Sequence, residues 1–195
     1  IDPAGDWMGG FAVGIHGIDP HSERFRADKD DYSDILLKAL ADLDKPLVAA
    51  VEGRAVGIGT TLLLHCDMVV VAEDALLSVP FINLALAPEA ASSLLLPRVI
   101  GHQRAYEMFA LGQPVDGRTA LAWGLANRAV AADAVDETAL DLARQLAARA
   151  PNSIRKTKAL MRDAECMWSL MQREGEREAA GSEGVVIGNE RPPHY

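Results

Sequence analysis

The fold is decided by the stretch from Lys45 to Gly101, KPLVAAVEGRAVGIGTTLLLHCDMVVVAEDALLSVPFINLALAPEAASSLLLPRVIG. It contains two continuous apolar runs, LVAAV at 47–51 and MVVVA at 68–72, and such runs are typical of strands buried on both faces. Between them a turn with three glycines, at 53–59, leads into TTLLLHC, which is short and apolar enough for a buried helix, although periodicity alone leaves a strand open. Strand, helix and strand in this order predict a βαβ unit in a parallel sheet, and therefore an α/β fold.

The segments around these two runs predict further helices. Asp30 to Leu43 places apolar residues on one face at helical spacing, and Lys45-Pro46 ends that helix. Ser78 to Ala87 reads as a loop or edge strand, and Pro88 opens a helix that Pro97 kinks or shortens. We then expect, in order, helices at 101–111 and 116–123, a strand at 125–130, helices at 133–150 and 152–171, and an irregular tail, GSEGVVIGNERPPHY.

Composition excludes several classes of protein. With 195 residues, the chain is expected to form one domain, or one domain with an appendage. Its formal net charge of −9 argues against nucleic acid as a partner, because phosphate binding needs clustered Lys and Arg. The longest apolar run, 62–77, is interrupted by charged residues and is too short to cross a bilayer, and the N-terminus has no signal-peptide pattern. The two cysteines, Cys66 and Cys166, have no metal-site or disulfide spacing, which points to the reducing cytoplasm.

Glu89 is the first candidate for chemistry. It is a lone carboxylate in an apolar segment, predicted at the start of a helix, and a general base fits such a place. From spacing alone an ordinary structural role is the preferred interpretation, because the helix macrodipole favours Glu in the first turn by roughly 0.3–1 kcal/mol. The general base stays open as the alternative.

Two near-identical glycine turns are the second candidate, AVGIH at 12–16 and AVGIG at 55–59. If they face each other, the backbone N–H groups of Ile15 and Ile58 converge on one oxygen and form an oxyanion hole. The alternative is that each is only a tight turn. The second turn lacks the spacing of a dinucleotide fingerprint and the Lys of a phosphate loop.

Other polar residues have simpler interpretations. His65 and Cys66 end an apolar helix and are expected to be satisfied core residues. No His/Cys cluster has metal-ligand spacing, so no metal is expected. Four cations of the C-terminal helices are interpreted as a solvated face, with an anionic ligand on a neighbouring subunit as the alternative: Arg155, Lys156, Lys158 and Arg162.

Taken together, these motifs resemble the enoyl-CoA hydratase/isomerase (crotonase) family from about Phe11 to about Arg162. The first match is the strand, glycine turn, helix, Cys-Asp and strand of the opening stretch, and the second is GQPVDGRTALAWGLANRAV at 112–130. The resemblance implies a crotonase-like spiral of ββα and βαβ turns, an acyl-CoA thioester substrate, and assembly into homotrimers or dimers of trimers. Coenzyme A belongs to the substrate, so no separate cofactor is implied.

The resemblance also assigns residues. The oxyanion-hole donors fall on Ile15 and Ile58, and residues 1–131 form the crotonase-like core, with 132–195 as a C-terminal helical oligomerisation region and irregular tail. The substrate-binding positions fall on Ala12, Gly14, Ala55, Gly57 and Leu86.

Within the family, the residues resemble the Δ3,Δ2-enoyl-CoA isomerase branch. The two glutamates of the hydratase branch align with Thr61 and Phe81, neither of which can serve as acid or base. NLALAPEAASS resembles the isomerase motif Pro-Glu-Gly-Cys-Ser-Ser and makes Glu89 the base that moves a proton from C2 to C4. The alternatives are an enoyl-CoA hydratase and a non-catalytic scaffold that binds acyl-CoA or a protein.

Three departures from the family pattern accompany the resemblance. The usual opening strands have no counterpart before Asp6, so we expect an N-terminal segment of the usual fold to be missing. His16 stands where the family has Asp, and the tail after Glu178 differs from the helical end of the family.

Overall fold

Parallel strands form the central sheet of the protein. The computed structural model describes residues 12–14, 38–162 and 164–182. The four-stranded sheet has the order β1-β2-β4-β7, and every neighbouring pair is parallel. Its strands are β1 (Ala12–Gly14), β2 (Val48–Val51), β4 (Met68–Ala72) and β7 (Arg128–Val130). The predicted βαβ unit and the α/β fold are therefore confirmed.

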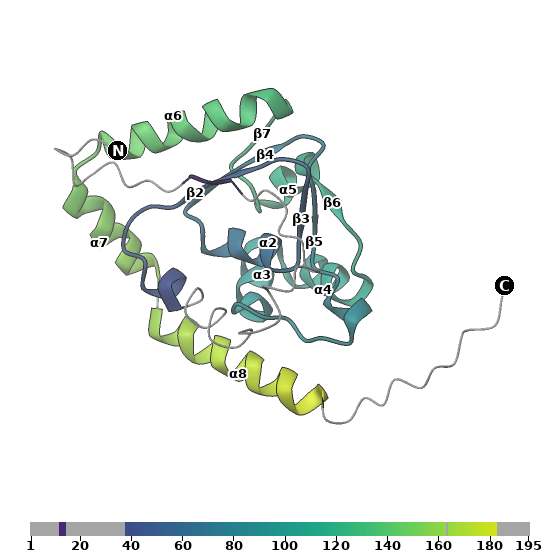
Figure 1. The fold of residues 1–195 in the computed structure, drawn as a ribbon. Helices are drawn as coiled ribbons and strands as arrows, with labels where there is room; N and C mark the ends of the chain where they lie inside the picture. The colour runs from purple at the N-terminus through teal and green to yellow at the C-terminus, as the bar shows by residue number, and fades with distance from the viewer. Residues whose placement is uncertain (1–11, 15–37, 163, 183–195) are drawn as a thin grey trace, which may run out of the picture.

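A second, smaller sheet lies beside the first (Figure 1). It consists of β3 (Arg54–Val56), β5 (Leu76–Ser78) and β6 (Val115–Asp116), with β3 parallel and β6 antiparallel to β5. The sequence predicted only a turn at 53–59. Since β3 has three residues, of which only Ala55 is buried, it offers no run of apolar residues for a pattern to detect.

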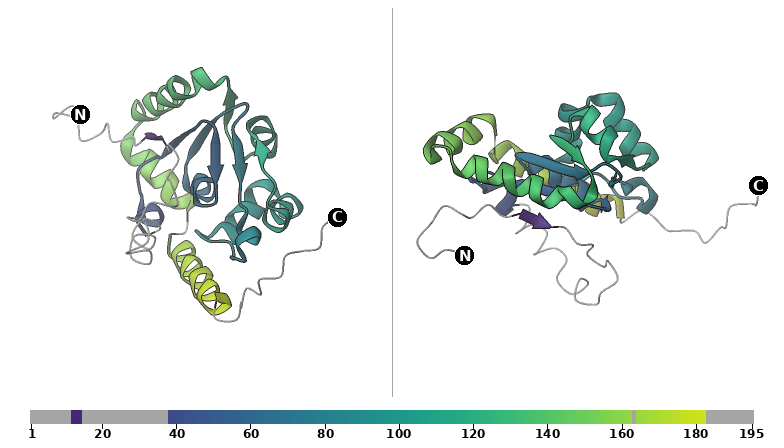
Figure 2. Two further views of the ribbon diagram at one scale, coloured as in Figure 1. Left: turned by 45° about the vertical axis from the view of Figure 1, so that its right-hand side comes forward. Right: turned by 90° about the horizontal axis from the view of Figure 1, so that it is seen from above.

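Helices surround both sheets. α2 (Ile58–Thr61) continues as a 3-10 helix, Leu62–His65, and further 3-10 turns occur at Phe81–Leu84 and Ala132–Ala134. The others are α3 (Ser92–Ile100), α4 (His102–Leu111), α5 (Gly117–Trp123), α6 (Val135–Ala147), α7 (Pro151–Met161) and α8 (Ala164–Ser182). α6 packs against β2 and β4, while α7 and α8 run down the side of the molecule (Figures 1 and 2).

The core is centred on β4. Val70 and Val71 are completely buried, because β2 and β7 flank the strand and α6 covers one face of the sheet. Leu77 of β5 and Leu96 of α3 extend the same cluster toward the second sheet. A continuous apolar run is what such a strand requires.

The helix predicted at 30–43 is present at 38–42, and its earlier part lies outside the described residues. Three predicted boundaries farther along the chain are wrong. The helix predicted from Pro88 begins only at Ser92, and it continues past Pro97 to Ile100. The single helix predicted over 152–171 is two helices, because Arg162 is extended (φ −128°, ψ 123°). The expected tail begins inside α8, which reaches Ser182.

Candidate active site

The glycine turn delivers one backbone donor to the candidate site. Gly57 has φ 57° and ψ −120°, a conformation that an L-residue rarely adopts, and it connects β3 directly to α2. Thr60 fixes this junction, since its hydroxyl donates to the Ala55 carbonyl at 2.8 Å and accepts from the Ser78 N–H at 3.2 Å. Ile58 is the first residue of α2, so its N–H has no acceptor within the helix. That this N–H serves as an oxyanion-hole donor stays a prediction.

Glu89 lies against the same helix. The hydroxyl of Thr61, completely buried in α2, donates to Glu89 Oε1 at 2.6 Å and lies 3.4 Å from the carbonyl oxygen of Ile58. A hydrogen bond to a carboxylate is charge-assisted, and it fixes the orientation of the Glu89 side chain. The Glu89 carboxylate therefore lies at the short helix that begins with Ile58, and the catalytic roles of these two residues stay predictions.

The two residues that follow Glu89 have left-handed backbone conformations and do not belong to a helix. Ala90 and Ala91 have φ angles of 55° and 57°, and the Ser92 N–H donates to the Glu89 carbonyl at 2.9 Å. A non-glycine residue in this region costs on the order of 1 kcal/mol or more. The prediction that Glu89 stands at the start of a helix is wrong for this reason, since two left-handed residues separate it from α3.

Two distant side chains hold the peptide group between Ala90 and Ala91. His65 Nε2 donates to the Ala90 carbonyl at 2.7 Å, and the Ala91 N–H donates to Glu174 Oε2 at 2.6 Å. Glu174 Oε1 also accepts from the N–H of Ser93 at 3.1 Å and from its hydroxyl. Burial raises the pKa of Glu174, while its hydrogen bonds to Ser93 and Ala91 oppose that rise.

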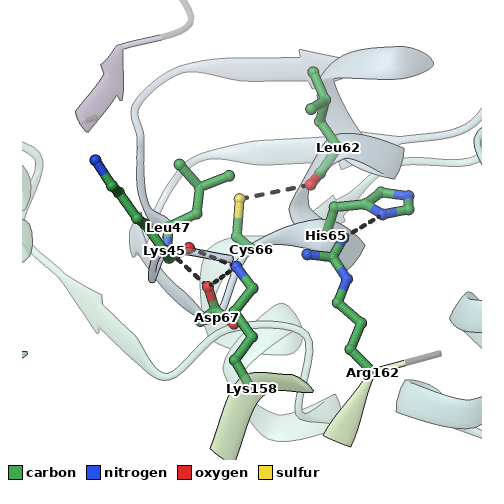
Figure 3. Close-up of polar contacts among 8 residues, drawn as sticks. All are labelled: Lys45, Leu47, Leu62, His65, Cys66, Asp67, Lys158 and Arg162. Atoms are coloured by element: carbon green, nitrogen blue, oxygen red, sulfur yellow. Dashed lines mark hydrogen bonds and ion pairs between the residues drawn. The ribbon is translucent and has the colours of Figure 1, made fainter. Parts of the chain in front are cut away.

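The protonation of His65 follows from its neighbours. A guanidinium can only donate, so Nδ1 must accept from Arg162, 3.0 Å away, and the proton of the neutral ring is on Nε2 (Figure 3). Burial lowers the pKa of His65 to about 4, opposed by the bond to Ala90 and assisted by the positive charges of Arg162 and Lys158. His65 is therefore a satisfied core residue, as predicted.

Lys158, by contrast, does not lie on the solvated face predicted for it. Its ammonium group donates to Asp67 Oδ2 at 2.7 Å and to the Lys45 carbonyl at 2.6 Å, and its side chain is only 6% exposed (Figure 3). Asp67 Oδ2 in addition accepts from the Leu47 N–H at 2.7 Å, beside the first residue of β2. The solvated face predicted for the C-terminal cations is wrong at Lys158 because this carboxylate is its partner.

The thiol of Cys66, which follows the 3-10 helix Leu62–His65, is unreactive. Burial, and then the charge of Asp67, raise the pKa of Cys66 to about 12, and its Sγ donates to the Leu62 carbonyl (Figure 3). The thiolate is the nucleophilic form, so Cys66 is not a nucleophile near neutral pH.

The remaining predicted positions are distributed around these residues. Ile15, the second predicted donor, lies outside the described residues, as does His16. Ala12 and Gly14 are the ends of β1, beside Val48 and Ala50 of β2. Ala55 is buried in β3, and Leu86 lies in the loop before Glu89, 38% exposed.

The two positions that carry glutamates in the hydratase branch are apolar or hydroxylic here. Phe81 is 8% exposed, and its ring packs against Phe109 with the ring centroids 6.4 Å apart. Thr61 has no carboxyl group, and its hydroxyl donates a hydrogen bond to Glu89. In the described part of the chain no cluster of His, Cys, Asp and Glu has a metal-binding arrangement, and no helix is long and apolar enough to cross a membrane.

Fold and site together define an α/β protein of the crotonase type, in which a glycine turn and a loop carboxylate meet at one short helix. The chain belongs to the enoyl-CoA hydratase/isomerase family, whose family model matches residues 10–183.

Individual relatives agree with this family. The chain is 37% identical over 126 residues to carnitinyl-CoA dehydratases of Citrobacter koseri and Salmonella typhi, a match covering 65% of this chain and 48% of each relative. The chain thus spans about half the length of the curated relatives it matches. An enoyl-CoA hydratase/isomerase of Pseudoalteromonas atlantica has a similar structure, with TM-score 0.74, 40% identity and coverage of 77% of this chain and 61% of that one. The structure of OdaA from Pseudomonas aeruginosa is also similar, with a TM-score of 0.72 and 46% sequence identity. That match covers 74% of this chain and 60% of OdaA.

Sequence reasoning missed His65 and Glu174 as parts of the site. His65 was placed correctly in the core, but nothing in the sequence pairs it with Ala90. Glu174 lies 83 positions from Ala91, in a helix whose other charged residues give no sign that this one is buried. No local pattern connects these positions, so the contact is visible only in three dimensions.

Proposed function

We propose that the protein is an isomerase of enoyl thioesters of coenzyme A that uses Glu89 as its single acid-base group. The observation that carries the proposal is the 2.6 Å hydrogen bond from Thr61 to the Glu89 carboxylate, within the turn of α2 that begins with Ile58. It holds the carboxylate against the helix whose first residue carries the predicted backbone donor, which supports the proposal. This pairing suits the removal of a proton next to a thioester carbonyl.

The reaction needs only these groups. In a 3-enoyl thioester, the Glu89 carboxylate takes a proton from C2, and the C–H electrons form a C1–C2 double bond while negative charge develops on the thioester oxygen. The N–H groups of Ile58 and, by the family resemblance, Ile15 donate to this oxygen. Protonated Glu89 then returns its proton to C4, the C3–C4 double bond moves to C2–C3, and the carbonyl re-forms. One proton leaves and one returns, so a single carboxylate completes the cycle.

Addition of water has less support from the site. It asks for a second group to position water, and the aligned positions hold Thr61 and the buried Phe81. Glu174 is the other carboxylate at this loop, but each of its oxygens already accepts from Ala91 or Ser93. It is committed to the loop and not to a water molecule.

One finding favours a second candidate, a hydratase or dehydratase. The relatives from Citrobacter koseri and Salmonella typhi are named carnitinyl-CoA dehydratases. Glu89 would then act on the proton at C2 while a hydroxyl group leaves from C3, or in the reverse direction add water to a 2-enoyl thioester. A non-catalytic scaffold that binds acyl-CoA is the reading left if neither reaction occurs.

Turnover of defined thioesters decides between these candidates. With a 3-enoyl-CoA, conjugation to the thioester is followed by ultraviolet absorbance, and with a 2-enoyl-CoA, hydration is followed by mass spectrometry. We expect isomerisation by the wild type and a loss of roughly 10²–10⁴-fold in kcat for Glu89→Gln, which keeps the size of the side chain but cannot take a proton. Glu137→Gln is the matched control, since Glu137 is 73% exposed and pairs with Arg144 at the surface of α6. Isomerisation that survives Glu89→Gln unchanged would sink the mechanism.

Assembly and location stay predictions. The family resemblance implies a homotrimer or a dimer of trimers, which sedimentation analysis would distinguish from a monomer. A cytoplasmic location and a place in fatty acid metabolism are predicted only from the expected thioester substrate and from the spacing of Cys66 and Cys166, which suggests no disulfide framework.

A further inference from the structure

We infer that Glu174 and His65 are positioning residues for Glu89, which act by clamping the peptide group that joins Ala90 to Ala91. The inference rests on the proposed role of Glu89 as the base. His65 and Glu174 bond to the backbone that follows Glu89, His65 at the Ala90 carbonyl and Glu174 at the Ala91 N–H.

The two contacts lie on opposite sides of one peptide plane. In a trans peptide the carbonyl and the N–H point in opposite directions. His65 Nε2 donates to the carbonyl of Ala90, and Glu174 Oε2 accepts from the N–H of Ala91. A peptide plane held at both edges cannot rotate, so ψ of Ala90 and φ of Ala91 are fixed together.

Both clamping groups are rigidly held. His65 is 3% exposed and Glu174 is 7% exposed. The other ring nitrogen of His65 accepts from Arg162, and the second oxygen of Glu174 accepts from Ser93. Each side chain therefore has one contact to the loop and another that fixes its own orientation, which is how a supporting group holds a reacting one in place.

Glu174 also replaces a missing helix cap. The residue that precedes α3 is Ala91, which has no side-chain oxygen, and α3 has no side-chain cap of its own. The carboxylate of Glu174 accepts the N–H groups of Ala91 and Ser93 at this end, where the helix dipole favours a negative charge. The helix start and the left-handed loop are thus fixed by one residue of α8.

Rotation of the peptide plane between Ala90 and Ala91 would displace Glu89. Alanine does not favour the left-handed region, so the Ala90–Ala91 conformation depends on these external contacts. Rotation of the peptide plane would turn the Ala90 carbonyl toward the Glu174 carboxylate and away from His65. Because the Ser92 N–H is bonded to the Glu89 carbonyl, the rotation would also shift the backbone of Glu89 and lengthen its contact with Thr61.

Steady-state kinetics test the inference. We expect Glu174→Ala to lower kcat for a 3-enoyl-CoA by about 10²-fold, with KM within about twofold of wild type, because misplacement of a reacting group affects the chemical step. Glu174→Gln keeps one acceptor oxygen and should recover part of this loss. Met167→Ala is the control: Met167 is buried two turns earlier in α8, so its loss should lower the melting temperature and leave kcat near wild type.

Amide exchange gives a readout that does not depend on turnover. By NMR, the Ala91 and Ser93 amides should exchange slowly in the wild type and in Met167→Ala, and at least about tenfold faster in Glu174→Ala. Wild-type kcat in Glu174→Ala, or an equal loss of kcat in Met167→Ala, overturns the positioning role. If the wild type turns over no enoyl thioester, the proposed function fails on its own. Amide exchange then still decides whether Glu174 holds the loop, and unchanged exchange overturns the clamp.

Discussion

The buried His65 makes the protein sensitive to acid in a defined range of pH. Replacing His65 with Gln removes the titrating ring and keeps one amide donor for the Ala90 carbonyl and one oxygen acceptor for Arg162. The charged groups that act on the ring are Arg162 and Lys158, and both disfavour its protonation. We expect the stability of the variant to vary less with pH than that of the wild type.

The magnitude follows from the pKa of His65. It is 6.5 in an unfolded chain and about 4 in the folded protein, and at 1.36 kcal/mol per pH unit this gap corresponds to about 3 kcal/mol. The lowered pKa means that the unfolded chain binds the proton more readily. The contribution to stability is therefore complete above pH 6.5 and is lost as the pH falls toward 4, with about 2.5 kcal/mol lost by about pH 4.5.

Urea unfolding measures this difference. Free energies of unfolding are obtained from tryptophan fluorescence between about pH 7.5 and about pH 4.5 for the wild type and for His65→Gln. Carboxylates titrate in both proteins; the raised pKa of Glu174, for example, favours the folded state as the pH falls in each. The comparison cancels such groups. Parallel pH profiles for the two proteins, offset by a constant, would refute the assignment of His65 as neutral and buried.

Three further substitutions test the packing of the protein. A Cβ at Gly117 would lie 1.9 Å from the Ala72 carbonyl oxygen of β4, so Gly117→Ala should destabilise the fold by about 3 kcal/mol or more. A Cβ at Gly175 of α8 would meet no atom within 4 Å, so Gly175→Ala should stabilise the fold by up to about 1 kcal/mol. Urea unfolding of both variants and the wild type measures these two changes. Lys158→Met leaves the Asp67 carboxylate without its cation, and we expect a loss of about 2–3 kcal/mol because Asp67 is partly exposed, again measured by urea unfolding. A loss below about 0.5 kcal/mol would mean that this pair contributes no more than a surface ion pair.

The central strands could be predicted because their physical requirement is visible locally. A strand between two parallel neighbours and beneath a helix must be apolar on both faces, and β2 and β4 show this as continuous runs. The start of α5 was also visible, since Asp116 accepts from the Thr119 N–H as an ordinary N-cap. Glu89 is predicted as the base only from the resemblance, because its position in the sequence alone favours an ordinary helix-start role.

The other features depend on distant partners and could not be predicted. Alanine has no tendency toward left-handed conformations, so nothing in the sequence indicates that Ala90 and Ala91 delay the start of α3. Lys158 has the spacing of a solvated cation and is buried only because Asp67, 91 positions earlier, pairs with it. β3 is too short to show any periodicity. In each case the decisive partner lies outside the local sequence: Lys158 pairs with Asp67, the Ala91 N–H bonds to Glu174, and β3 pairs with β5.

Charged side chains in and between the C-terminal helices α7 and α8 form hydrogen bonds to specific groups in and near the candidate site. Lys158 of α7 meets Asp67, Arg162 meets His65, and Glu174 of α8 meets the Ala91 N–H. A buried charge without its partner costs several kcal/mol, whereas an apolar contact that slides by one residue costs far less. Rotation of α8 by a single residue would remove Glu174 from the loop and leave two backbone N–H groups without their acceptor. These polar contacts therefore define one docking position for the C-terminal helices, and through Ala90 and Ala91 that position determines where Glu89 stands relative to Ile58.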